Sequence, residues 1–241
     1  RVGCRKRDGP MKAVVCTALG EPPQLQVREW PSRPPGPGEI RVALHAGGVN
    51  FGDLLVTAGR YQVKLAPPFV LGTEGAGVVA ECGAGVRRFV EGDRVLVQNN
   101  DVRGCFADEV TLPAARAVLV PAGIRLVDIA GFPLNFGTSY YALLHRARLV
   151  KGEVLAVHGA SGGVGLAAVK LGKMMGATVI ATGSDDVKLR AVKAEGADYV
   201  VNARTELLAE RIRELTDGRG ADGCACMGVC GCGRMSASGG A

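Results

Sequence analysis

The stretch that decides the fold runs from Leu155 to Gly165 and reads LAVHGASGGVG, a short apolar run that enters a glycine-rich turn. Apolar residues recur at helical spacing after the turn, and a second apolar run ends at Thr182. Strand, glycine turn, helix and strand in this order form a βαβ unit that lets a pyrophosphate approach the backbone and the helix start. We therefore expect a dinucleotide-binding turn, the alternative being a turn without a ligand. Its residues are Ala160, Ser161, Gly162, Gly163, Val164 and Gly165.

The end of the second strand indicates which dinucleotide is bound. An acidic residue there would hold the ribose 2′ hydroxyl of NAD, but the position is occupied by Gly183. Ser184 offers a hydroxyl and Lys188 a positive charge, so the sequence favours NADPH. In the alternative interpretation the segment only begins a helix, with Ser184 or Asp185 as its N-cap and Lys188 as a solvated residue. NADPH binding requires that Asp185 and Asp186 point away from the 2′ phosphate.

Composition and charge exclude several classes of protein. The 241 residues are 47% apolar, which suits a globular protein with enough chain for two domains. No apolar run approaches the roughly 20 residues of a membrane span, and no secretory signal is visible. The formal net charge of +6 is spread without a basic stripe, so we expect no nucleic acid partner. These features favour a cytoplasmic or mitochondrial protein without a membrane span.

The pattern of apolar runs divides most of the chain into three parts. Residues 1–10 are basic and lack periodicity, and we expect a disordered leader. Over residues 11–134, short β-rich runs are separated by proline and glycine, which predicts an irregular β domain. Helix and strand alternate over residues 135–222, which predicts a dinucleotide-binding α/β domain. The expected strands of the β domain are Lys12–Thr17, Leu25–Trp30, Ile40–Ala46, Val78–Glu81 and Arg94–Gln98.

Several further motifs occur in order along residues 11–222. They are Gly36-Pro37-Gly38-Glu39, Gly48-Val49-Asn50-Phe51-Gly52-Asp53, Gly59-Arg60-Tyr61, Leu71-Gly72-Thr73-Glu74-Gly75-Ala76-Gly77, Gly92-Asp93-Arg94-Val95 and the glycine turn. With these motifs the chain resembles the medium-chain dehydrogenases/reductases, and most of all their zinc-free quinone oxidoreductase branch. The resemblance implies a GroES-like β domain followed by a Rossmann domain with a doubly wound parallel sheet. It also implies a homodimer joined through Rossmann sheet edges, by a strand that this sequence does not supply.

The same resemblance indicates that catalytic zinc is not expected. Zinc alcohol dehydrogenases of this superfamily carry cysteine where this chain has Asn50, histidine where it has Thr73, and a second cysteine near Leu134. These three residues do not make the N/S ligand set that zinc requires. Without a Lewis acid, acceptors that take up hydride readily are favoured, which are quinones and activated alkenes.

Three residues are expected at the reacting end of the cofactor because of the resemblance. Asn50 is expected to offer its amide near the nicotinamide or the acceptor oxygen, and Tyr61 to place a hydroxyl at the wall of the site. Thr138 is expected to help orient the carboxamide of the nicotinamide. The alternatives are a turn asparagine, a packed core tyrosine and a helix cap, respectively.

The composition changes abruptly after Asp222, where residues 223–232 read GCACMGVCGC. We expect residues 223–241 to be a disordered, aberrant tail, and the Rossmann domain to be partial and truncated at its C-terminal side. Two Cys-x-Cys pairs leave a soft-metal site as the alternative, although no histidine supports it. Without a fourth strand, Val154–His158 is expected to be an unprotected sheet edge, and the purified chain to aggregate.

Three functions remain open from the sequence. The first is an NADPH-dependent quinone oxidoreductase, in which hydride passes from the cofactor to a small-molecule quinone. The second is an NADPH-dependent alkene or enoyl reductase, which differs in the acceptor alone. The third is a catalytically inactive nucleotide-binding fragment.

Overall fold

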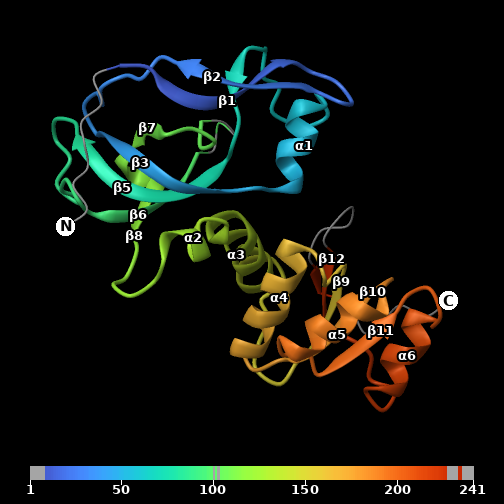
Figure 1. The fold of residues 1–241 in the computed structure, drawn as a ribbon. Helices are drawn as coiled ribbons and strands as arrows, with labels where there is room; N and C mark the ends of the chain where they lie inside the picture. The colour runs from blue at the N-terminus through green and yellow to red at the C-terminus, as the bar shows by residue number, and fades with distance from the viewer. Residues whose placement is uncertain (1–8, 100, 102–103, 227–232, 235–241) are drawn as a thin grey trace. The chain divides into compact units, whose positions relative to one another are not determined.

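The computed structural model describes residues 9–99, 101, 104–226 and 233–234 (Figure 1). The chain divides between Pro133 and Leu134 into two compact units, which we call unit 1 and unit 2. Disorder was expected for residues 1–10 and 223–241. Of these, residues 1–8, 227–232 and 235–241 lie outside the described residues, whereas Gly223–Cys226 forms a strand, contrary to the expectation.

Unit 1 contains two antiparallel sheets. The three-stranded sheet has the order β2-β1-β4, and the five-stranded sheet has the order β7-β3-β5-β6-β8. Its strands are β1 Met11–Ala18, β2 Gln24–Trp30, β3 Glu39–Gly48, β4 Phe69–Val70, β5 Glu74–Cys82, β6 Arg94–Gln98, β7 Glu109–Pro113 and β8 Ala117–Leu119. Its helical segments are α1 Phe51–Thr57, η1 Ala114–Arg116 and α2 Leu126–Ile129. All five strands predicted for this part are present, extended at their ends except for β6, which has its predicted bounds.

The core of unit 1 is built by residues that alternate along the strands. Val42, Val79, Val95 and Val97 are fully buried in the interior of the five-stranded sheet. Val95 and Val97 are two residues apart, which places both on one face of β6, and β-branched side chains suit a pleated surface. A separate cluster around Cys16, Val56 and Phe69 packs β1 and β4 against α1.

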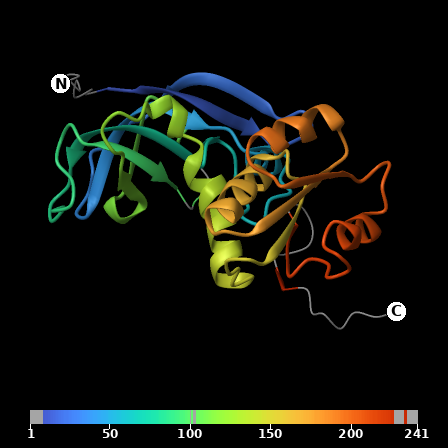
Figure 2. The same ribbon diagram turned by 90° about the horizontal axis from the view of Figure 1, so that it is seen from below.

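Unit 2 is a mainly parallel sheet flanked by helices, in which only β13 of the described strands runs antiparallel to its neighbour β12 (Figures 1 and 2). The strand order is β11-β10-β9-β12-β13, in which β9 pairs in parallel with both β10 and β12. The helical segments are α3 Phe132–Tyr141, which begins in unit 1, η2 Ala142–Arg146, α4 Gly163–Met174, α5 Asp186–Ala194 and α6 Leu208–Glu214. The strands are β9 Val154–His158, β10 Thr178–Gly183, β11 Tyr199–Asn202, β12 Gly223–Cys226 and β13 Gly233–Arg234.

The two faces of this sheet are covered by different helices. Leu155, Val157, Val179 and Ala181 share one buried cluster with residues of α4 and α5. Val154, Ile180 and Val201 share another cluster with residues of α6. Successive side chains of a strand point to opposite faces, so this division follows from the odd and even positions of β9 and β10. The chain passes from β9 through β10 to β11 on one side of β9 and then returns to form β12 on the other side. This order is that of a doubly wound sheet.

Strand β12 corrects one expectation from the sequence. Gly223–Cys226 forms a strand and pairs in parallel with all but the first residue of β9, so Val154–His158 is not an unprotected edge. Asp222 fixes this register, because its Oδ2 accepts from the Val154 N–H at 2.8 Å and its own N–H donates to the Val154 carbonyl at 2.9 Å. Ala225 is fully buried beside β9, where a small apolar side chain fits. The expected aggregation at this edge therefore loses its structural basis.

Candidate cofactor and active site

The glycine turn follows β9 directly and ends at α4. Gly159 has φ +66°, a conformation that favours glycine, and Gly162 is the extended N-cap residue of α4. A Cβ on Gly165 would lie 2.4 Å from the Gly159 carbonyl oxygen, and one on Gly163 would lie 2.7 Å from Asn135 Oδ1. The turn and the start of α4 therefore have this close geometry only with glycine at these positions.

The six predicted cradle residues differ in exposure. Ala160 is buried and its N–H donates to the Thr182 carbonyl at 3.1 Å, which ties the turn to β10. Ser161, Gly162 and Gly163 are exposed at the start of α4, whereas Val164 is half-buried and Gly165 is buried. The exposed residues lie just before α4 and at its first residue, Gly163, and the first N–H groups of a helix lack partners within it. This arrangement fits a phosphate group.

Ser139 supports the turn and was not identified from the sequence. It lies on α3, is fully buried, and donates from Oγ to the Val164 carbonyl at 2.7 Å. The neighbouring Thr138 is exposed within α3 and is not a helix cap, because α3 continues to Tyr141. A serine within an apolar helical run gives no sequence signal for such a support.

The other end of the cofactor site follows β10. Gly183 ends the strand, and a Cβ there would lie 3.2 Å from Leu189. Ser184 and Lys188 are both exposed at the start of α5. Asp185 is the N-cap of α5, and its carboxylate accepts from the Lys188 N–H at 3.0 Å. This hydrogen bond, with the nearby positive charge of Lys188, lowers the pKa of Asp185.

Asp186 is also bound to a partner, because Asn202 Nδ2 donates to its Oδ1 at 2.6 Å. Asn202 is mostly buried at the end of β11, beside Gly183. NADPH binding requires that both aspartates point away from the 2′ phosphate. The hydrogen bonds of Asp185 and Asp186 are consistent with this requirement.

A polar cluster in unit 1 surrounds Asn50, between the end of β3 and α1. Asn50 Nδ2 donates to Glu74 Oε1 at 2.7 Å, and the Asn50 N–H donates to Asp53 Oδ2 at 2.8 Å. Thr73 Oγ1 donates to Asp53 Oδ1 at 3.2 Å. Glu74 is 0% and Asp53 5% exposed. We call Asn50, Asp53, Thr73 and Glu74 the Asn50 cluster.

Burial dominates the electrostatics of the Asn50 cluster. It raises the pKa of Asp53, against the hydrogen bonds from Asn50 and Thr73, which lower it. Burial also raises the pKa of the adjacent Cys105 thiol to about 12, and the carboxylates of Glu74 and Asp53 add to this effect. Close packing accompanies the polar network, since a Cβ on Gly48 would lie 2.6 Å from Glu74 Oε1. The sequence motifs contained Asp53 and Glu74, but nothing in them showed that both contact Asn50.

Tyr61 lies in unit 1 but outside this network. Its ring is half-buried against the cluster of Cys16, Val56 and Phe69, and its N–H donates to the Leu55 carbonyl at 3.0 Å. The structure thus places the ring as a packed side chain beside α1, where Cε2 would lie 3.6 Å from a Cβ on Gly52. The role of its hydroxyl stays a prediction.

Among the described residues, no group of three or more His, Cys, Asp or Glu side chains could hold a metal ion. Two of the positions at which zinc enzymes of the superfamily carry ligands are Asn50 and Thr73, and both belong to the Asn50 cluster.

Likewise, no described helix combines the length and hydropathy of a membrane span.

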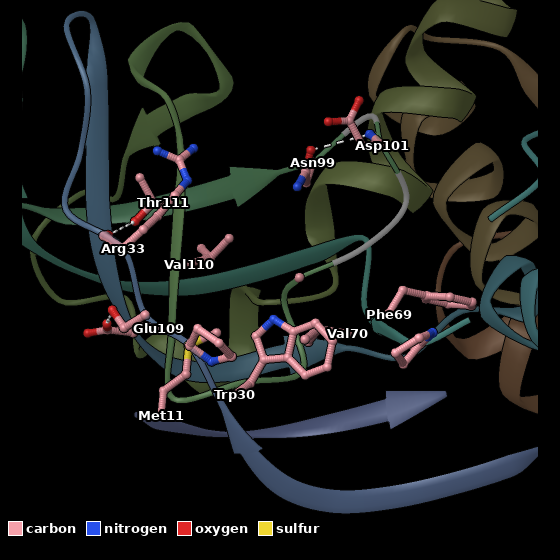
Figure 3. A pocket seen from close by; sticks show the side chains of 14 residues that line it. Met11, Trp30, Arg33, Phe69, Val70, Asn99, Asp101, Glu109, Val110 and Thr111 are labelled. Atoms are coloured by element: carbon pink, nitrogen blue, oxygen red, sulfur yellow. Dashed lines mark hydrogen bonds between the residues drawn. The ribbon is translucent and has the colours of Figure 1, made fainter. Parts of the chain in front are cut away.

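Unit 1 also has a cavity of about 330 Å³ beside β2, β4 and β7 (Figure 3). Figure 3 shows Trp30 between Met11 and Phe69 on its apolar side. Its charged groups already have partners, since Glu109 accepts from Ser32 Oγ and Arg33 pairs with Glu39. None of the predicted site residues lines this cavity, and we assign it no role.

Comparison with known proteins gives the class. The family model of the alcohol dehydrogenase GroES-like domain matches residues 36–123, and that of the zinc-binding dehydrogenases matches residues 163–229. The expected order of a GroES-like β domain and a Rossmann-type domain is thereby confirmed. The chain belongs to the medium-chain dehydrogenase/reductase superfamily.

Named relatives agree with this assignment. Quinone oxidoreductase-like protein 2 of Rattus norvegicus is 37% identical over 213 residues, which cover 87% of this chain and 59% of the relative. Its homolog from Nematostella vectensis is 36% identical over 212 residues, covering 88% of this chain and 57% of the relative. The chain thus spans less than two thirds of the length of these relatives.

Solved structures of similar fold differ in what they bind or catalyse. An NAD-dependent alcohol dehydrogenase has a TM-score of 0.83 at 34% identity, with 89% of this chain and 70% of that chain covered. Escherichia coli quinone oxidoreductase complexed with NADPH has a TM-score of 0.76 at 31% identity, covering 88% and 64%. The JamJ enoyl reductase has a TM-score of 0.77 at 32% identity, covering 89% and 66%.

Proposed function

We propose that unit 2 binds NADPH and that the chain belongs to an enzyme that transfers hydride from NADPH to a quinone without zinc. The observation that carries this proposal is the end of β10, where Gly183 stands in place of a carboxylate and both following aspartates are hydrogen-bonded elsewhere. A dianionic 2′ phosphate would meet Ser184 and Lys188 there.

The glycine turn supports binding of the cofactor pyrophosphate. Residues 161–163 are exposed where the 12-residue helix α4 begins, and Gly163 and Gly165 let the helix start pack closely against Asn135 and the Gly159 carbonyl. When bound, the nicotinamide would supply the hydride, and the residues of this chain would position it and the acceptor.

Asn50 is the residue of unit 1 that we propose for such positioning. Its Nδ2 is held by the buried Glu74 carboxylate, so the orientation of the amide is fixed before any ligand binds. Tyr61 is proposed to offer its hydroxyl to the acceptor, and Thr138 to hydrogen-bond the carboxamide of the nicotinamide. Thr138 is exposed and can reach a ligand, while Tyr61 is half-buried.

The acceptor is the part of the proposal with two candidates. Asn50 and Thr73 replace zinc ligands of the superfamily, which favours acceptors that need no Lewis acid. A quinone is the first candidate because of the quinone oxidoreductase relatives. An activated alkene is the second, because an enoyl reductase has a similar fold at 32% identity.

A steady-state assay separates these candidates. The purified chain is given NADPH with a small quinone or with an enone, and loss of the reduced nicotinamide is followed by absorbance. Faster oxidation with the quinone supports quinone reduction, and faster oxidation with the enone supports alkene reduction. Binding of NADPH without turnover of either acceptor would contradict the catalytic proposal and support a nucleotide-binding role alone.

A further inference from the structure

Arg204 lies at the same edge of the parallel sheet as Ser184 and Lys188. Gly183 and Asn202 are paired where β10 and β11 end, and the Ala203 N–H donates to the Gly183 carbonyl at 2.8 Å. The carboxyl ends of adjacent parallel strands are where doubly wound folds bind their ligands. Arg204 follows one residue after this last backbone hydrogen bond.

The backbone around Arg204 is fixed by hydrogen bonds. Its N–H donates to Asn202 Oδ1 at 3.0 Å, and the Asn202 N–H donates to Glu206 Oε1 at 2.8 Å. The same Asn202 side chain binds Asp186 at 2.6 Å. One asparagine thus holds the loop after β11 and also binds the acidic side chain of Asp186 at the start of α5.

At this edge the acidic side chains have hydrogen-bond partners, whereas the basic side chains form no ion pair among the described residues. Asp185 and Asp186 accept hydrogen bonds from the Lys188 N–H and from Asn202, respectively. Arg204 and Lys188 are exposed, and within the described part of the chain neither side chain forms an ion pair. The positive charges of both contribute to the low pKa of Asp185, which indicates that all three groups are near one another.

We propose that Arg204 is a specificity-determining residue that binds the 2′ phosphate of NADPH together with Lys188 and Ser184. Its planar guanidinium can donate two parallel hydrogen bonds to phosphate oxygens, which Lys188 cannot do. A 2′ hydroxyl, as in NADH, carries no charge for Arg204 to bind. This inference rests on the proposed binding of NADPH and adds the residue that would distinguish the two cofactors.

The test uses calorimetric titration of the full chain with 2′,5′-ADP and with 5′-AMP, two probes that differ by the 2′ phosphate. Arg204→Ala is expected to weaken 2′,5′-ADP binding about fivefold, since charged hydrogen bonds are strong but this one is solvent-exposed. Binding of 5′-AMP is expected to stay unchanged. Arg213→Ala is the matched control, because Arg213 is an exposed arginine near the C-terminal end of α6 and its loss is expected to affect neither probe.

The outcomes distinguish this inference from the function on which it rests. A preference of the unaltered chain for 2′,5′-ADP that survives Arg204→Ala overturns the role of Arg204 and leaves NADPH binding supported. The absence of any preference in the unaltered chain overturns both. An equal loss of both probes in Arg204→Ala indicates a structural role for Arg204 and also overturns the inference.

Discussion

The Asn50 cluster of unit 1 and the cofactor site of unit 2 are organised in opposite ways. In the Asn50 cluster, buried side chains bind one another, with Glu74 fully buried and Asp53 nearly so. In unit 2, the groups proposed to bind ligand are backbone amides and exposed side chains at the ends of strands, such as Lys188. Substitutions should therefore affect folding first in the Asn50 cluster and binding first in unit 2.

The glycine turn is an exception, because substitutions there are expected to affect both folding and ligand binding. Gly165 is buried and packs against the backbone of Gly159, so its lack of a side chain is needed by the fold, and the turn to which it belongs is also proposed to bind the pyrophosphate. Substitutions at the end of β10 are therefore expected to change ligand binding with little effect on stability, whereas substitutions in the turn after β9 are expected to change both.

The largest effect is expected for Gly165→Ala. The added Cβ would lie 2.4 Å from a backbone oxygen that cannot rotate away, so α4 must shift. We expect the free energy of unfolding to fall by about 2 kcal/mol and NADPH binding to be lost, as measured by denaturant melts and calorimetry. Gly137→Ala is the control, because a Cβ there has open space within α3 and is expected to be neutral or stabilising. Equal stability of the two variants would contradict the close packing of the turn.

The next largest effect is expected for Asn50→Asp, which is nearly isosteric but removes the donor to Glu74. A half-buried carboxyl group at position 50 would then face the fully buried Glu74 carboxyl, and the pKa of one of them would rise. We expect a loss of about 2 kcal/mol at neutral pH that shrinks as the pH falls, because protonation of one carboxyl removes the repulsion. Asn50→Ala is the control, since it removes the donor without adding charge, and its loss should depend less on pH. Indistinguishable pH profiles for the two variants would count against the contact with Glu74.

A smaller and more selective effect is expected for Lys188→Ala. Lys188 is exposed, and its backbone N–H, which donates to the N-cap carboxylate of Asp185, is retained in the variant. We expect NADPH to bind about fivefold more weakly and NADH as before, with little change in the melting temperature. Titration with both cofactors checks this, and an equal loss of NADPH and NADH would contradict a contact with the 2′ phosphate.

The smallest effect is expected for Glu39→Gln in unit 1. Arg33 donates to both carboxylate oxygens of Glu39, at 2.5 and 2.7 Å, and this lowers the pKa of Glu39 to about 2. Because the folded pKa lies below the unfolded value of about 4.3, the pair stabilises the fold above that value and its contribution is lost as the pH falls toward 2. Glu39→Gln should therefore lower the melting temperature slightly at neutral pH and not at pH values near 2. A constant difference across this range would refute the assignment.

Much of the architecture could be predicted because its signals are local. The strands and the glycine turn of unit 2 follow from apolar runs and from Gly159 and Gly162, and β9 has the bounds that were predicted. Strand β12 could not be predicted in the same way, because Gly223–Cys226 has neither the length nor the apolar pattern of a strand. Its formation depends on pairing with β9 and on the hydrogen bonds between Asp222 and Val154. These two residues are 68 positions apart in the sequence.

The candidate site shows the same division. The exposed Ser184 and Lys188 were identified because their position follows the strand directly. The contacts of Asn50 with Glu74 and of Asp186 with Asn202 span 24 and 16 residues, and no local pattern reveals them. Sequence therefore predicted which groups are available to a ligand, whereas the structure was needed to show which groups are already bound to others.

The most direct test of the central claim is a calorimetric titration of the purified chain with NADPH and, in parallel, with NADH. The account predicts that NADPH binds about tenfold or more tightly than NADH, because a 2′ phosphate would meet Ser184, Lys188 and Arg204 without a facing carboxylate. Equal binding of the two cofactors, or a preference for NADH, would contradict it.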